Sequence, residues 1–307
     1  MTTCANLSAL LTDKGVLLAV TEQVARSMNG ASSRRLAVAL DDIALGPEFL
    51  DPSDAEWLQE GLDRAEREDR LRFWSSEVER LSNEAVQIVS CVDLAYPTNL
   101  AMIHDRPPLL FVRGEITAAD IRAVAVVGTR TASADGIKIA SSIASELANG
   151  GITIISGLAK GIDTAAHAAA INRNGRTIAV YGTTIDKVYP VANRGLARSI
   201  AAAGACVSQF LPTTQTGPWC FPVRNVTTSG LSLGTIVVEA GSTSGAKIQA
   251  EAAIAHGKRV FLVEQLVMTQ AWAKAMAEHP QVTVASQVAE IVSIVDAEVA
   301  PSDGILV

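Results

Sequence analysis

The sequence predicts an α/β fold, with a doubly wound and mostly parallel sheet behind a small helical N-terminal domain. Short apolar runs that do not alternate with polar residues, such as 124–127 and 152–156, are typical of strands buried on both faces. Each run ends at a small-residue turn, and an alanine-rich segment with helical spacing follows it. A succession of such units indicates a parallel sheet with helices on both faces.

Length and composition agree with a globular protein. The chain has 307 residues, of which 49% are hydrophobic and 19% charged. No apolar run reaches the roughly 18 residues that span a bilayer, and the N-terminus lacks the features of a secretory signal. The four cysteines are scattered, without disulfide or metal-ligand spacing. We therefore expect a cytoplasmic protein with no membrane partner, no metal and no cofactor.

The charge distribution is uneven along the chain. The formal net charge of −7 argues against a protein that coats nucleic acid indiscriminately, but it leaves room for a locally positive groove. Acidic residues cluster in 51–84, whereas the glycine-containing turns further on carry Arg130, Lys160, Arg224 and Lys247.

The N-terminal part reads as helical, and we place it in a domain of residues 1–82. Helical spacing covers 7–11, 16–28 and 33–45, and one long charged helix is expected from Asp51 through Leu81. The second domain is expected at 83–298, followed by a tail at 299–307. A fragment that begins at Asn83 should be soluble and should keep most of its ligand affinity.

Two short strands are expected at the start of the second domain, over 86–92 and 106–114, with one helical turn at 100–104 between them. Strand and helix signals then alternate. The expected strands are 124–127, 152–156, 177–181, 206–209, 235–239, 259–263 and 282–284. The expected helices are 136–149, 164–174, 193–203, 246–256, 270–278 and 286–295.

Small-residue turns follow several of these strands. One begins at Gly128, one at Gly157 and one after Glu239, and a fourth segment, 221–225, follows a long irregular loop at 211–220. In an open parallel sheet, ligands bind outside the carboxyl ends of the strands, where backbone N–H groups and helix N-termini favour anions. The turns match neither the dinucleotide fingerprint nor the Walker loop. We therefore expect them to form one phosphate-binding crevice.

Two cations define this crevice. Arg130 would direct two donors at a phosphate and Lys160 would add a compact charge, while the backbone N–H groups of 128–130 and 157–161 complete a cradle. Both cations are expected to point into one crevice, because they follow strands that should be neighbours.

Several nearby side chains have alternative roles. Ser133 either caps the following helix or touches phosphate, and Arg224 with Asn225 either contacts the ligand or pairs with a carboxylate, Glu239 or Asp163, to hold the loop. Asp163 itself is expected as a helix N-cap rather than a catalytic carboxylate.

Three further side chains leave a similar choice. His167 is expected to pack and hydrogen-bond inside the protein. Trp219 and Phe221 can stack on bases, as in single-strand binders, although an aromatic content of 4% is low for an extended stacking platform.

The segment 86–294 resembles the DprA/Smf family of DNA-processing proteins. The matching blocks are 96–97, 107–114, 126–130, 156–163 with 166–167, 179–182, 189–190, 221–225, 239–240 and 244–245. The resemblance implies a Rossmann-like fold, single-stranded DNA binding, homodimerisation, and delivery of DNA to a RecA-type recombinase during natural transformation. The chain departs from the family pattern at 226–228, 246–249 and 264–265, and we expect no winged-helix domain after the core.

We expect a protein that binds single-stranded DNA without enzymatic activity. The residues expected to bind nucleic acid are Gly128, Thr129, Arg130, Ser133, Ser156, Gly157, Lys160, Gly161, Phe221, Arg224, Asn225, Ser244, Gly245 and Lys247. Two other functions stay open, namely a nucleotide-processing enzyme or nucleotide sensor on the same fold, and a structural subunit that binds a partner.

Overall fold

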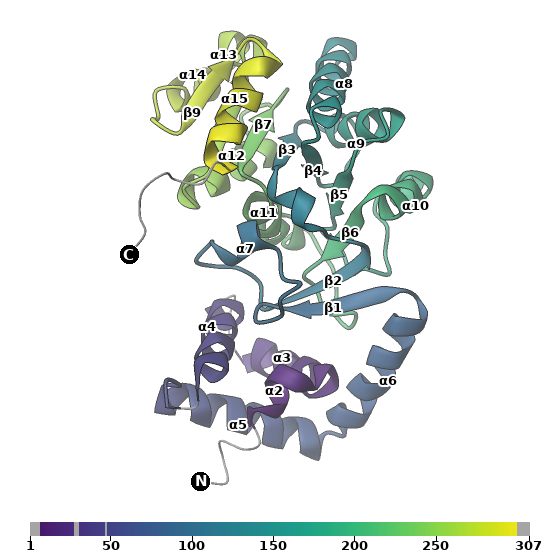
Figure 1. The fold of residues 1–307 in the computed structure, drawn as a ribbon, viewed down its shortest axis with the longest axis vertical. Helices are drawn as coiled ribbons and strands as arrows, with labels where there is room; N and C mark the ends of the chain where they lie inside the picture. The colour runs from purple at the N-terminus through teal and green to yellow at the C-terminus, as the bar shows by residue number, and fades with distance from the viewer. Residues whose placement is uncertain (1–6, 28–30, 47, 300–307) are drawn as a thin grey trace.

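A cluster of helices at the N-terminus packs beneath a sheet that runs through the rest of the molecule (Figure 1). The computed structural model describes residues 7–27, 31–46 and 48–299. Met28, at the end of one predicted helix, and residues 300–307 of the predicted tail lie outside these residues. Within the described residues, no helix is both long and apolar enough to cross a membrane.

The predicted long charged helix is two helices. The helices of this part are α2 (Ala9–Thr12), α3 (Lys14–Ser27), α4 (Ala31–Leu45), α5 (Pro52–Arg67) and α6 (Arg70–Asn83). The chain breaks at Asp69, whose φ of 52° is left-handed. The break turns α6 toward α3, where Trp74 is fully buried and donates to Glu22 Oε2 at 3.0 Å. Helical periodicity continues across the break, so the pattern alone did not reveal it.

The sheet has nine strands, in the order β1-β2-β6-β5-β4-β3-β7-β8-β9. The strands are β1 (Val86–Ser90), β2 (Leu109–Gly114), β3 (Ala123–Val127), β4 (Thr153–Ser156), β5 (Thr177–Val180), β6 (Ala205–Ser208), β7 (Gly234–Val237), β8 (Arg259–Val263) and β9 (Val282–Ala285). β1 and β2 are antiparallel to their neighbours, and all strands from β6 to β9 along the sheet are parallel. The predicted mostly parallel sheet is therefore confirmed.

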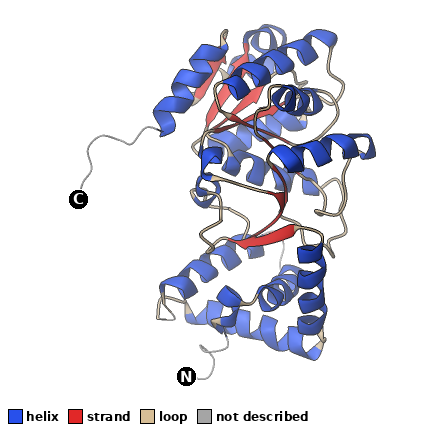
Figure 2. Ribbon diagram, turned by 45° about the vertical axis from the view of Figure 1, so that its right-hand side comes forward, coloured by secondary structure: helices blue, strands red, loops and turns tan. Residues whose placement is uncertain are grey.

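Helices lie on both sides of this sheet (Figure 2). They are α7 (Thr98–Ala101), η1 (Ala118–Ile121), α8 (Ala134–Asn149), α9 (Ile162–Asn172), η2 (Val191–Asn193), α10 (Arg194–Ala203), α11 (Cys220–Leu231), α12 (Gly245–Ala255), α13 (Glu264–Thr269), α14 (Ala271–Met276) and α15 (Val288–Val299). In β3, Val124 and Val126 belong to the hydrophobic cluster beneath α8, α9 and α15, whereas Ala125 and Val127 join clusters on the other side. Successive residues of β3 are thus buried under helices on opposite faces of the sheet, as expected for a doubly wound fold.

The helical part and the sheet share buried surface. One continuous hydrophobic cluster contains Leu17, Trp74 and Leu81 of the helices together with Leu109 and Phe111 of β2. The predicted domain boundary, between residues 82 and 83, falls at the last residue of α6, and independent folding on either side of it stays a prediction.

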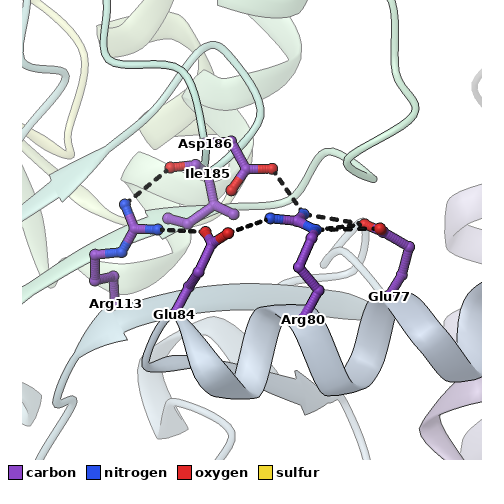
Figure 3. A network of polar contacts seen from close by, with 6 residues as sticks. All are labelled: Glu77, Arg80, Glu84, Arg113, Ile185 and Asp186. Atoms are coloured by element: carbon purple, nitrogen blue, oxygen red, sulfur yellow. Dashed lines mark hydrogen bonds and ion pairs between the residues drawn. The ribbon is translucent and has the colours of Figure 1, made fainter.

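Charged side chains also cross this junction (Figure 3). Arg80 of α6 contacts Glu77 at 3.0 Å, Glu84 at 2.7 Å and Asp186 at 3.1 Å. Arg113 of β2 lies 3.6 Å from the second oxygen of Glu84. We refer to Glu77, Arg80, Glu84, Arg113 and Asp186 as the junction network. Each of its charges has an opposite partner.

Candidate nucleic-acid interface

A cavity of about 510 Å³ opens at the carboxyl ends of β3, β4 and β7. The predicted site residues that line it are Gly128, Thr129, Arg130, Gly157, Phe221, Arg224, Asn225, Ser244 and Gly245. The segment 221–225, for which no helix was predicted, lies in the first half of α11, and Phe221, Arg224 and Asn225 from it line the cavity at the strand ends. We call this space the strand-end cavity.

The turns after β3, β4 and β7 are held together by backbone contacts. Thr129 N donates to the carbonyl of Glu239 at 2.6 Å, and Ile162 N donates to the carbonyl of Thr129 at 3.3 Å. Gly161 has a positive φ of 77°, and a Cβ there would overlap the Thr129 carbonyl. Gly161 thus serves close packing between two turns, and it does not line the cavity.

Arg224 is fixed inside the protein as well as lining the cavity. Its Nη1 donates to the carbonyls of Gly157 at 3.0 Å and Val180 at 2.6 Å, which joins the ends of β4 and β5. A Cβ on Gly157 would overlap the guanidinium, so the glycine makes room for it. Burial lowers the pKa of Arg224, and the charge of Asp163 opposes that shift. The guanidinium is therefore largely committed to the fold.

Asp163 is not the N-cap of α9, which corrects that prediction. Gly161 holds the N-cap position, and the Asp163 carboxylate turns back to accept from Gly157 N at 3.1 Å and Ala159 N at 3.3 Å. Burial raises its pKa, and the charge of Arg224 opposes this. The carboxylate stabilises the turn after β4. The backbone N–H groups of that turn bind it in place of the N–H groups at the start of α9.

His167 packs inside the protein, as predicted. Its Nδ1 lies 2.7 Å from Thr177 Oγ1, which itself donates to the carbonyl of Ile154 at 2.7 Å. Because the threonine proton is used, Nδ1 carries the hydrogen of this contact. Burial lowers the pKa of His167 to about 3 and keeps the ring neutral.

The N-terminus of α8 is already occupied by a carboxylate. Ser133 caps the helix by accepting from Gly136 N at 2.9 Å, and its hydroxyl donates to Glu239 Oε2 at 2.8 Å. Of the two roles considered for Ser133, the structure shows the helix cap. The Glu239 carboxylate lies where an anion could otherwise bind at the N-terminus of α8. Neither residue lines the strand-end cavity.

Three other predicted residues also lie outside the cavity lining. Ser156 is fully buried and donates to the carbonyl of Val126 at 2.6 Å. Lys247 lies 3.6 Å from Glu251 on the same helix. Lys160 is exposed and does not line the cavity. The expectation that Arg130 and Lys160 both point into one crevice is therefore not met by Lys160: Gly157 and Ala159 of the same turn line the cavity, but the Lys160 side chain is exposed and does not.

Arg130 and Phe221 line the cavity and form a row with Tyr189, which lies beside Phe221 outside the lining. The Arg130 guanidinium lies over the Phe221 ring, 4.9 Å from its centroid, and the Phe221 and Tyr189 rings are 6.1 Å apart. Tyr189 is 56% exposed. Among the described residues, no carboxylate forms an ion pair with Arg130. Trp219 packs edge-on against Phe210, at 5.8 Å, and so belongs to a separate pair.

Gln249 was not among the predicted site residues. Its side chain lines the cavity and is only 2% exposed, yet neither its amide nitrogen nor its amide oxygen has a hydrogen-bond partner among the described residues. Buried amides are nearly always paired, so this one points to a ligand. The available signal was the departure from the family pattern at 246–249, which the sequence shows but does not explain.

The model of the DNA recombination-mediator protein A family matches residues 87–297. The chain belongs to this family. The resemblance to DprA/Smf proteins is thereby confirmed, and the matched region contains every strand of the sheet except the first residue of β1.

Relatives with known names agree with this family. DNA processing protein DprA of Streptococcus pneumoniae is 42% identical over 174 residues, which cover 57% of this chain and 61% of the relative. Protein Smf of Escherichia coli is 41% identical over 167 residues, or 54% of this chain and 45% of the relative. The match thus spans about half the length of these relatives.

Solved structures show the same fold. The X-ray structure of DprA from Streptococcus pneumoniae has a TM-score of 0.72 and 28% identity, and the match covers 90% of this chain and 97% of that one. A structure that describes the single-stranded DNA binding mode of DprA from Helicobacter pylori has a TM-score of 0.61 and 23% identity, with 69% and 96% covered.

Proposed function

We propose that this protein binds single-stranded DNA in the strand-end cavity, with the phosphate backbone at Arg130. The observation that carries the proposal is the amide of Gln249 on the cavity wall, which is buried and has no partner among the described residues. A buried polar group without a partner costs free energy, and a bound base or phosphate would supply the missing hydrogen bonds. The Helicobacter pylori structure, which is described as showing a single-stranded DNA binding mode of DprA, supports the choice of ligand.

The row formed by Arg130, Phe221 and Tyr189 favours single strands over duplex. Stacking on the exposed Tyr189 ring requires an unpaired base, and it is tolerant of sequence because every base has a π-face. An arginine without a carboxylate partner keeps its donors for phosphate. We therefore expect binding without strong sequence preference.

The described residues of the cavity lining lack a free general base, which supports a binding protein rather than an enzyme. Asp163 is the one carboxylate among these lining residues, and backbone N–H groups already occupy it. A general base needs a free carboxylate or imidazole within reach of the substrate. The bound DNA would then pass to a RecA-type recombinase, and the protein would act as a homodimer, as family membership implies.

The test is a titration of the full chain with a fluorescent dT oligonucleotide, with dTMP and a duplex of equal length as competitors. The proposal predicts that the oligonucleotide binds and that neither competitor displaces it efficiently. Tight binding of dTMP would favour the nucleotide-sensing alternative. A preference for duplex, or no binding of either ligand, would contradict the proposed function.

A further inference from the structure

Three potential metal ligands meet far from the strand-end cavity. They are His104 and Asp105, in the turn after α7, and His256, at the C-terminal end of α12. One ligand atom from each residue lies within 4.8 Å of the others. The two histidines are 152 positions apart in the sequence, which is why no spacing motif revealed them.

His256 is held with one nitrogen facing this cluster. Its side chain is 2% exposed, and its Nδ1 lies 2.9 Å from Ser229 Oγ on α11. That contact fixes the ring and leaves Nε2 to face Asp105, 2.9 Å from Oδ1. Metal-binding histidines characteristically use the second ring nitrogen in this way, because it sets the tautomer and the orientation.

Asp105 supplies an anionic oxygen. Its Oδ1 is buried, and no donor among the described residues is aligned with it for a hydrogen bond, despite the short distance to Nε2. The short distance to Nε2 without an aligned N–H differs from an ordinary histidine–aspartate hydrogen bond, and it leaves both atoms able to face one bound ion.

His104 completes the set from the solvent side. It is exposed, and its ring stands edge-on to His256 with centroids 5.6 Å apart. Ligand atoms of a tetrahedral zinc site are about 3.3 Å apart, given metal–nitrogen distances of about 2.0–2.1 Å. The ligand atoms here lie within 4.8 Å of one another, and rotation of the exposed His104 side chain can shorten its distances to the other two ligands without movement of the backbone.

We propose that His104, Asp105 and His256 bind one divalent transition-metal ion of the zinc class. Two imidazoles and one carboxylate suit zinc, whereas magnesium and calcium prefer oxygen ligands throughout. The ion would tie the turn before β2 to the C-terminal ends of α11 and α12. α12 has 11 residues and its N-terminus lines the strand-end cavity, so the two sites lie about 16 Å apart along the helix.

The test uses the full chain, freed of metal by a chelator and titrated with zinc chloride in a calorimeter. We expect one zinc ion per chain and a higher melting temperature with zinc. The variant His104→Ala should lower the affinity by at least about tenfold, because one of the three ligands is lost. Because His104 is exposed, this variant should fold normally.

Two further variants separate a built site from casual zinc binding. Ser229→Ala, which removes only the contact that orients His256, should weaken zinc binding by about ten- to hundredfold. His279→Ala removes a histidine outside the cluster and should bind zinc like the unaltered chain. If the unaltered chain binds no zinc, or if His104→Ala and His279→Ala bind it equally well, the proposal is wrong.

Discussion

The junction network and the strand-end cavity use polar side chains in opposite ways. At the junction, Arg80 contacts three carboxylates and Arg113 shares one of them. In the cavity, Arg130 has no carboxylate partner among the described residues. Neither the nitrogen nor the oxygen of the Gln249 amide has a hydrogen-bond partner among them. Both regions contain arginines, and they differ in whether the polar side chains find partners within the fold itself.

This difference separates structural polarity from functional polarity. Paired groups lower the free energy of the folded state modestly, whereas an unpaired buried group raises it. Gln249 carries such a cost at the carboxyl ends of parallel strands, where ligands of this fold class bind, and the proposed function attributes that cost to a bound ligand. Substitutions in the cavity should therefore change binding, and substitutions at the junction should change stability.

The largest effect is expected from Arg130→Ala. The loss of a charge-assisted contact to phosphate is worth about 1.5–3 kcal/mol, or roughly ten- to hundredfold in affinity for a dT oligonucleotide. Thermal melting should be unchanged, because the guanidinium rests on the exposed side of the cavity against the Phe221 ring. Arg130→Lys should restore part of the affinity, since the charge remains but the forked geometry does not.

Lys160→Ala is the matched comparison for this variant. The exposed ammonium lies outside the cavity lining and contributes only a screened charge, so its removal should weaken binding less than Arg130→Ala does. An equal or larger loss would mean that DNA follows the turn after β4 rather than the cavity.

Gln249→Met should move binding and stability in opposite directions. Methionine has nearly the same shape, so affinity should fall roughly three- to tenfold through the lost hydrogen bonds. The urea midpoint should stay the same or rise, because a buried unpaired amide is removed. Gln287→Met, at an exposed position, is the control and should change neither quantity. A fall in the midpoint at position 249 would show that the amide has a structural partner after all.

At the junction, Arg80→Met should lower stability and leave binding unchanged. The network is partly exposed, so we expect a loss of about 1 kcal/mol in the free energy of unfolding, measured in urea. Oligonucleotide affinity should be that of the unaltered chain. Weaker DNA binding without a change in stability would break the separation between the two regions.

The smallest effect on binding is expected when the helical part is removed. A fragment of residues 83–307 keeps every residue of the strand-end cavity, and its affinity should match that of the full chain. Its stability should fall, because the shared cluster of α3, α6 and β2 is opened. An inactive but folded fragment would show that the helices contribute to the DNA site.

The sequence was sufficient for the sheet because each strand was locally marked. Runs such as 124–127 are apolar on both faces and end in glycine turns, so their type and order could be read directly. The break at Asp69 and the helix that begins at Cys220 were not marked in this way. Both depend on packing against distant segments, which override local pattern.

The site was predictable in position but only partly in role. The turns after the strands were expected to converge, and those that begin at Gly128 and Gly157 do line one cavity. Whether a polar side chain faces the ligand depends on its partners: Ser133 is taken by Glu239, and Arg224 by two backbone carbonyls. These partners lie at the ends of other strands, far away in the sequence, so the local sequence pattern does not reveal them.

The most direct test of this contrast is the salt dependence of oligonucleotide binding, measured for the unaltered chain, Arg130→Ala and Arg80→Met. If roughly three to five phosphates are neutralised, the slope of log affinity against log salt should be about −2 to −3.5 for the unaltered chain. Arg130→Ala should be shallower by about 0.7, the value for one phosphate on a single strand, while Arg80→Met should keep the original slope. A slope near zero, or an equal slope for all three proteins, would contradict phosphate binding at Arg130.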